Sequence, residues 1–148
     1  MTSRRIALAL TLATAAGLAA GATVLAAPST TSPRPPVIKL KNDRFGFILA
    51  TRRRLPLYYW SVEKRAGRNQ IRCTGDCARV WPPVLLRRGQ TMPARLRGVR
   101  GRFGVVRRPD GRRQVTHNGR PLYSYHNDPP NTVLCNNVDG WFVVRVTN

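Results

Sequence analysis

Two short aromatic strings that each end in a carboxylate are the residues of this chain most able to support chemistry. They are Tyr58, Trp60 and Glu63 in the first string and Tyr123, Tyr125 and Asp128 in the second. Two carboxylates brought together would allow general acid–base catalysis. Because each acid follows a strand-like run, we instead predict that both accept backbone N–H bonds in the turns that follow. We therefore predict that these six residues are structural and that the chain has no catalytic residue.

The two strings are copies of one unit. Pro56 to Glu63 repeats without a gap at Pro121 to Asp128, 65 residues later. Tyr58 and Trp60 share one face of a strand by its two-residue period, as do Tyr123 and Tyr125. We predict that these four rings form a core between the repeats, with their polar tips at its edge.

The N-terminus has the features of an export signal. Arg4 and Arg5 precede an apolar run from Ile6 to Ala27, and small residues near Ala26 provide a cleavage point. We predict a signal peptide over residues 1–26; the alternative is an uncleaved anchor, since the run is long enough to cross a bilayer. The mature chain is expected to be secreted or extracytoplasmic and associated with the cell envelope.

The rest of the chain divides by composition. The predicted parts are a Pro-rich tether with a first strand at 27–45, a first repeat at 46–86, a connector at 87–102 and a second repeat at 103–148. No segment shows a sustained helical period, and Asn118-Gly119 is a strong hairpin turn signal that places Gln114 opposite Tyr123. The predicted fold is all-β, with antiparallel hairpins and meanders from two related repeats that share one aromatic core.

The chain is strongly basic, with 26 Lys and Arg against 6 Asp and Glu and a formal net charge of +20. Removal of the signal peptide leaves 24 basic residues and a net charge of +18. Arginine groups occur at 52–54, 87–88, 95–102, 107–108 and 112–113. The main anion-binding candidates are Arg52, Arg53, Arg54, Arg107, Arg108, Arg112 and Arg113. We expect weakly specific, salt-sensitive affinity for an anionic envelope polymer or lipid surface, and no nucleic-acid partner in vivo.

Together these motifs resemble the bacterial secreted-repeat or predicted-lipoprotein family, which is marked by Tyr-x-(Phe/Trp/Tyr)-x-x-Asp. The second string fits this pattern in full, and the first has Glu63 in place of the aspartate. Further similar segments are Cys73-Thr74-Gly75-Asp76-Cys77-Ala78, Trp81-Pro82-Pro83, Asp110-Gly111, Gln114-Val115-Thr116 and Gly119-x-Pro121-Leu122-Tyr123. The resemblance implies an exported repeat protein of undefined activity. Family members often carry a lipobox cysteine; this signal region has none, so no lipid anchor is expected.

The three cysteines allow two interpretations. In an oxidising compartment Cys73 and Cys77 are expected to form a disulfide. Cys135 is then free, paired between molecules, or paired in place of one of the two. The alternative is extracytoplasmic redox, metal or haem handling, with Cys135, His117 or His126 as further ligands. Two thiolates are too few for a closed zinc site, so we expect no metal and no cofactor.

The predicted function is non-enzymatic: an envelope-associated binding or structural protein with affinity for anionic polymer. No Ser/His/Asp or Cys/His arrangement and no phosphate-binding glycine loop can be assembled from the local motifs. Redox or metal handling is the alternative, and an enzyme acting on wall polymer ranks below both.

Overall fold

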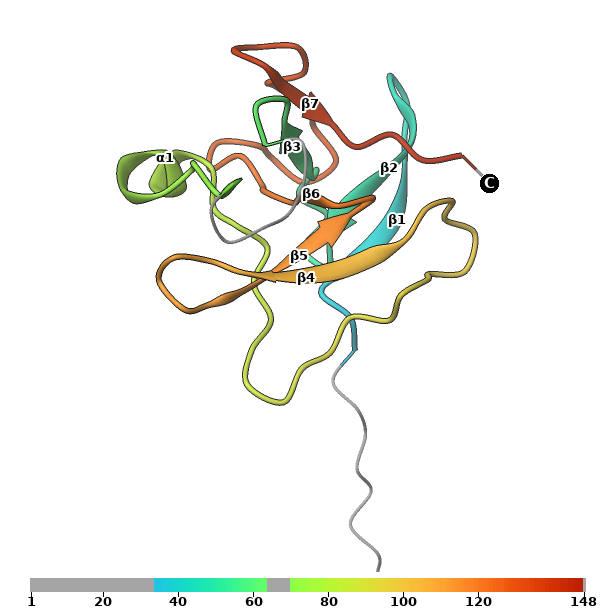
Figure 1. Cartoon of the computed structure of the whole chain (residues 1–148). Coiled ribbons are helices and arrows are strands. Elements are labelled where there is room, and N and C mark those ends of the chain that lie inside the picture. Colours follow the sequence, from blue (N-terminus) through green and yellow to red (C-terminus); the bar gives the residue numbers. More distant parts are fainter. Residues whose placement is uncertain (1–33, 64–69, 148) are drawn as a thin grey trace, which may run out of the picture. The chain divides into compact units, whose positions relative to one another are not determined.

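The computed structural model describes residues 34–63 and 70–147, and within these ranges it consists mainly of short antiparallel strands, with one short helix at one side of them (Figure 1). The elements in chain order are β1 (Val37–Asn42), β2 (Gly46–Thr51), β3 (Tyr58–Trp60), α1 (Gly75–Val80), β4 (Phe103–Arg107), β5 (Arg113–His117), β6 (Arg120–Pro121) and β7 (Trp141–Val143). The all-β prediction is confirmed, with α1 as a small addition. The predicted signal peptide lies outside the described residues. None of the described helical residues form a span suited to crossing a membrane.

Each repeat begins with a β-hairpin. β1 pairs with β2, and β4 pairs with β5, both antiparallel. β1, the first strand predicted within residues 27–45, pairs along its whole length with β2. The second hairpin continues into β6 through Asn118-Gly119, whose φ angles of 50° and 77° suit a turn with two left-handed residues. Thr116 lies opposite Pro121, which is the register predicted from this turn.

An extended segment at the end of the first repeat, residues 82–86, pairs with the sheet of the second. Leu85 lies opposite Gln114 and Pro83 lies opposite Tyr123, so residues 82–86 lie between β5 and the second aromatic string. The prediction that Gln114 faces Tyr123 directly is therefore wrong. Beyond the Asn118-Gly119 turn, β5 and the second aromatic string diverge because residues 82–86, the exchanged strand, lie between them.

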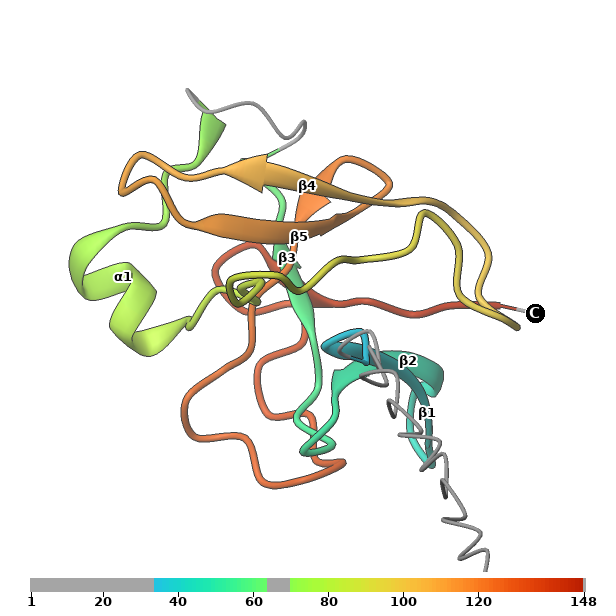
Figure 2. The ribbon, with the colours of Figure 1, turned by 90° about the horizontal axis from the view of Figure 1, so that it is seen from below.

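The second repeat contributes an equivalent strand to the first repeat. In β7 and the residues that follow it, Val143 lies opposite Tyr58 and Arg145 lies opposite Ile48. This strand therefore lies between β2 and β3, as residues 82–86 do in the other half. Figure 2 shows the two hairpins as separate ribbons with β3 running between them. The repeats are thus interlocked by a reciprocal strand exchange with approximate two-fold symmetry.

The shared aromatic core lies where the two repeats meet. Tyr58 and Tyr123 exchange backbone hydrogen bonds of 2.8 and 2.9 Å. The rings of Trp81 and Trp141 stack at 3.9 Å between centroids, and they contact Tyr58 and Tyr123 edge-on at 5.3 and 5.2 Å. Trp60 extends the stack from Trp141 at 5.3 Å. A shared aromatic core was predicted, but its centre is this tryptophan pair.

A second, mainly aliphatic cluster fills the space next to the two hairpins. It contains Val37, Leu49, Leu57, Val84, Leu86, Phe103, Val115, Leu122, Val144 and Val146. Val84 and Val144 occupy equivalent places in the two exchanged strands, and both are buried. Burial of these side chains from both repeats means that neither repeat has a complete core by itself.

Candidate functional site

The two aromatic strings are joined by hydrogen bonds that cross between the repeats. Tyr58 Oη donates to Asp128 Oδ2 at 2.6 Å, and Tyr123 Oη donates to Glu63 Oε2 at 2.8 Å. All four side chains are buried, with exposed fractions of 0 to 5%. The prediction that these tyrosine tips reach the edge of the core is wrong. Each phenol can be buried because the other repeat supplies a carboxylate acceptor.

The same acids also hold the backbone of the segments that follow them. Glu63 Oε1 accepts from the N–H groups of Arg72 and Cys73 at 2.7 and 3.0 Å. Asp128 Oδ1 accepts from the N–H of Leu134 at 3.1 Å. Every oxygen of the two carboxylates therefore has a donor, which is the arrangement expected of buried structural acids.

Burial keeps the two phenols protonated. It raises the pKa of Tyr58 and of Tyr123 far above the ordinary value, and the neighbouring carboxylates add to the shift. Burial also raises the pKa of Asp128, against the opposing effect of its hydrogen bond from Tyr58. These tyrosines are therefore permanent donors, and their chemistry is that of a structural clamp between repeats.

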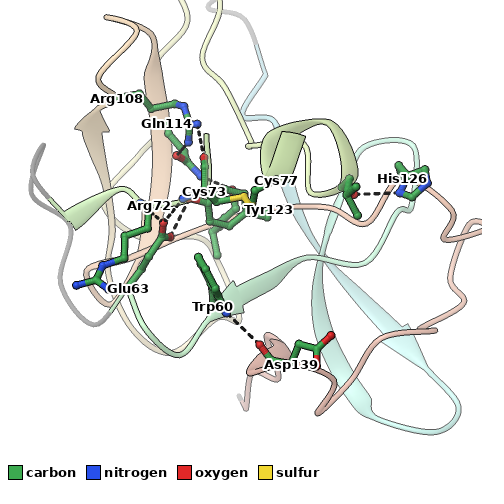
Figure 3. The surroundings of a disulfide bond; sticks show 12 residues. Trp60, Glu63, Arg72, Cys73, Cys77, Arg108, Gln114, Tyr123, His126 and Asp139 are labelled. Carbon is green, nitrogen blue, oxygen red and sulfur yellow. Dashed lines mark hydrogen bonds between the residues drawn. A yellow bond between two sulfur atoms is a disulfide. The ribbon is translucent and has the colours of Figure 1, made fainter. Parts of the chain in front are cut away.

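The predicted disulfide between Cys73 and Cys77 is confirmed. Cys73 is also the point at which the disulfide loop meets the buried network, as Figure 3 shows. Its N–H donates to Glu63 Oε1, and its carbonyl accepts from Arg108 Nη2 at 2.7 Å. The left-handed backbone of Gly75, with φ of 53°, turns the chain into α1 between the two cysteines.

Arg108 belongs to this buried network and not to the surface. Its side chain is 1% exposed and donates to Gln114 Oε1 at 2.6 Å as well as to the carbonyl of Cys73. Gln114 in turn donates to the carbonyl of Leu122 at 2.8 Å. The Nε of Arg108 lies 3.5 Å from Asp110 Oδ2 without forming a hydrogen bond. This corrects the expectation that Arg108 binds anions, because its guanidinium is enclosed by protein.

Removal of the disulfide is expected to lower the free energy of unfolding by about 2 kcal/mol, the chain-entropy value for so short a loop. The variant carries Cys73→Ser and Cys77→Ser, and urea denaturation without reductant measures the change. Cys135→Ser is the control and should cost less. Thiol titration of the unfolded wild-type chain should find one thiol, and three would contradict the pairing.

The remaining candidate metal ligands, Cys135, His126 and His117, have separate surroundings. Cys135 is free and half-buried, and burial raises the pKa of its thiol. His126 Nδ1 lies 3.1 Å from the carbonyl of Val80, and His117 Nε2 lies 3.0 Å from that of Arg100. Across residues 34–63 and 70–147, no three His, Cys, Asp or Glu side chains are grouped to hold a metal ion.

The burial of two acids makes the surface more basic than the composition indicates. Glu63 and Asp128 are enclosed, and the exposed acids are Asp43, Asp76, Asp110 and Asp139. Two of these form ion pairs with neighbouring arginines, Arg79 with Asp76 and Arg112 with Asp110. Hydrogen bonds from Arg112 hold the pKa of Asp110 at about 2, so this carboxylate stays charged. Most exposed arginines therefore face water with few anions near them.

Five of these arginines line one groove of about 730 Å³, which we name the basic groove. They are Arg34, Arg52, Arg53, Arg87 and Arg88, all exposed. No acid lines the groove, and Pro83, Val84 and Ser124 provide part of its lining. The structure thus brings together two arginine groups that are 35 residues apart in the sequence.

One wall of the basic groove is the turn after β2. Thr51 closes this turn: its N–H donates to the carbonyl of Leu55, and its hydroxyl accepts from the N–H of Leu55. Arg54 has a φ of 66°, a strained value for a residue other than glycine, and its N–H donates to the carbonyl of Thr51. This tight turn places Arg52 and Arg53 along the groove.

The opposite wall is held by Gln90. Its Oε1 accepts from the N–H of Arg87 at 3.1 Å, and its Nε2 donates to the carbonyl of Arg34 at 2.9 Å. Arg113 adds bonds from Nη2 to the carbonyls of Arg87 and Gln90 at 2.9 and 3.0 Å. Gly89, with φ of 75°, allows the turn between them. Arg113 therefore supports the groove instead of lining it.

Sequence reasoning missed Arg34 and Gln90, since neither lies in a cluster. Arg54 and Arg107 are exposed outside the basic groove, and Arg112 is paired with Asp110. Of the seven main candidates, only Arg52 and Arg53 line the groove.

The two halves of this structure correspond to a known repeat. A family model described as a secreted repeat of unknown function matches residues 39–85 and 104–145. Each match runs from the first hairpin of a repeat into its exchanged strand. No curated protein and no solved structure gives a significant match to the chain.

Proposed function

The chain belongs to a family of secreted repeats of unknown function, and we propose that it is a non-enzymatic binding protein for an anionic polymer of the cell envelope. The observation that carries this proposal is the basic groove. Five exposed arginines line its volume of about 730 Å³, and no acidic residue lines it. The family description places such proteins outside the cytoplasm, where wall polymers rather than nucleic acids supply negative charge.

Guanidinium chemistry suits phosphate and carboxylate groups. Each arginine presents up to five N–H donors in a planar fork that binds such groups through two parallel bonds. Because these side chains are exposed, each contact contributes only about 0.2–1 kcal/mol. Useful affinity therefore needs several contacts at once, which a polymer with repeated charges provides.

The groove is also held in shape before any ligand arrives. Gln90 joins the backbone of Arg34 to that of Arg87, and Thr51 closes the turn that carries Arg52 and Arg53. A fixed backbone limits the ordering cost of binding to the arginine side chains.

Binding of long-chain polyphosphate over a series of sodium chloride concentrations tests the proposal. We expect the logarithm of the binding constant to fall linearly with the logarithm of salt, because bound arginines release counterions from the polymer. Dextran, a neutral polymer, should not compete. Salt-independent binding, or no binding at low salt, would overturn the proposal. Tighter binding to phosphatidylglycerol vesicles than to polyphosphate would assign the groove to a lipid surface instead.

A further inference from the structure

The approximate two-fold relation between the repeats creates a second groove with different chemistry. It encloses about 690 Å³. The side chains that give it its character are Tyr59, His117, Asn118, Arg120, Asn136 and Phe142, and we name it the aromatic groove.

The two grooves are built on equivalent backbone. In the basic groove the N–H of Val84 donates to the carbonyl of Leu122 at 2.9 Å. In the aromatic groove the N–H of Val144 donates to the carbonyl of Leu57 at 2.8 Å. An exchanged strand therefore lines each groove, and the repeats differ in the side chains that they place on it.

Matching positions show how far the two grooves have diverged. The repeat of the aromatic string puts Tyr59 where the basic groove has Ser124. The turn after β5 puts Asn118 close to where the first repeat has Arg52, which lies in the turn after β2. A ring thus takes the place of a serine, and an amide takes the place of one guanidinium group of the basic groove.

Two aromatic rings form an apolar surface in the aromatic groove. Tyr59 and Phe142 are cross-strand partners in β3 and β7, and their half-buried rings stack at 5.6 Å with 20° between their planes. The guanidinium of Arg120 lies 4.2 Å over the ring of Tyr59. This cation–π contact holds the Arg120 guanidinium over the Tyr59 ring, beside Phe142. The other cation of the lining, Arg145, is exposed.

Two amides lie beside this surface in fixed orientations. Asn118 Oδ1 accepts from the N–H of Arg102 at 2.9 Å, and Asn136 Oδ1 accepts from the N–H of Val143 at 3.1 Å. These bonds use the carbonyl oxygen of each side chain. Within the described part of the chain, neither amide NH₂ group donates a hydrogen bond to the protein. Both are therefore oriented donors for a ligand.

His117 adds a neutral polar group. Burial lowers the pKa of its imidazole, so the ring is uncharged at neutral pH. Because Nε2 faces the carbonyl of Arg100 at 3.0 Å, the ring proton belongs on Nε2 and Nδ1 is left as an acceptor.

We propose that the aromatic groove binds a neutral pyranose ring of an envelope glycan. A pyranose has an apolar C–H face that packs on aromatic rings, and hydroxyl groups at its edge that pair with amide donors and an imidazole acceptor. The groove volume is within the range of small-ligand sites, and the mixture of rings and few oriented polar groups is typical of them. This inference is independent of the basic groove.

The test is an NMR titration of the full mature chain with a tetramer of N-acetylglucosamine. We expect backbone and side-chain shifts at Asn118, Asn136 and Phe142, with affinity in the millimolar range. Phe142→Leu and Tyr59→Leu keep apolar volume but remove the ring face, so each should weaken the binding about ten-fold or more while the folded spectrum is retained. Ser124→Ala, at the position equivalent to Tyr59, is the matched control and should change nothing.

Several outcomes would overturn this inference. They are an absence of shifts at about 10 mM sugar, shifts confined to the basic groove, and full affinity in both leucine variants. Tighter binding of a uronic acid oligomer in the aromatic groove would replace the neutral sugar with an acidic one. Because Phe142→Leu leaves all five arginines of the basic groove unchanged, polyphosphate binding by this variant separates the two sites.

Discussion

Replacing Glu63 with alanine is expected to lower the free energy of unfolding by about 4 kcal/mol. The change leaves the O–H of Tyr123 and the N–H of Cys73 without an acceptor in the core, and each unsatisfied buried donor costs about 1–3 kcal/mol. It also leaves a cavity where a fully buried side chain lay. Since a domain of this size has a total stability of about 5–15 kcal/mol, the variant should be close to unfolding. Urea denaturation at neutral pH measures the loss.

Two further variants distinguish the loss of the cross-repeat hydrogen bonds from the general effects of a substitution. Asp43→Ala removes an exposed acid and should change stability by less than about 0.5 kcal/mol. Glu63→Gln keeps the volume but replaces one acceptor oxygen by an amide, so an intermediate loss is expected. A loss below about 1 kcal/mol for Glu63→Ala would contradict the structural role of the cross-repeat bonds.

Replacing four arginines of the basic groove by glutamine is expected to weaken polyphosphate binding about 100-fold at low salt. The variant carries Arg52→Gln, Arg53→Gln, Arg87→Gln and Arg88→Gln. At about 0.7 kcal/mol for each exposed contact the four changes sum to roughly 3 kcal/mol, which corresponds to this factor. The salt dependence of binding should also become shallower, because fewer counterions are released.

The matched control removes the same charge from the connector. It carries glutamine at Arg95, Arg97, Arg100 and Arg102, all of which are exposed. A loss several-fold smaller than that of the groove variant is expected. Gln90→Leu tests geometry without changing charge, and should weaken binding several-fold because it releases Arg34 from Arg87. Equal losses in the groove and connector variants would show that net charge alone causes the affinity.

Local pattern was sufficient to predict the strand content and the turns. The Asn118-Gly119 turn and the register next to it follow from the short-range preferences of these two residues. The repeat of the aromatic string predicted two related units with a shared core. The Cys73–Cys77 pair followed from spacing and from the predicted compartment. These features depend on residues close together in the sequence.

Such local patterns could not predict which residues of one repeat contact which residues of the other. The period of a strand shows that Tyr58 faces inward, but it does not show that Asp128 will be its acceptor. The exchange of residues 82–86 and β7 depends on long-range packing, and it separates the backbone of Gln114 from that of Tyr123, although their side chains still meet. Arg108 is a surface candidate by its sequence, because the sequence does not show that its guanidinium will be buried against Gln114 and the carbonyl of Cys73.

The basic groove illustrates the same limit. Arg52 and Arg53 were predicted as candidates from a charge run, but their proximity to Arg87 and Arg34 depends on the exchanged strand between them. Gln90 carries no charge and lies in no motif, although it joins the backbone of Arg34 to that of Arg87. Sites built from several segments of a chain become visible only in the folded structure.

The most direct test of the central claim is an NMR titration of the mature chain with short polyphosphate, in which arginine side-chain and backbone signals are followed. Binding in the basic groove predicts the largest shifts at Arg52, Arg53, Arg87, Arg88 and Ser124, and loss of these shifts in the four-arginine groove variant. Equal shifts at Arg95, Arg97, Arg100 and Arg102, or no shifts at these five residues, would contradict it.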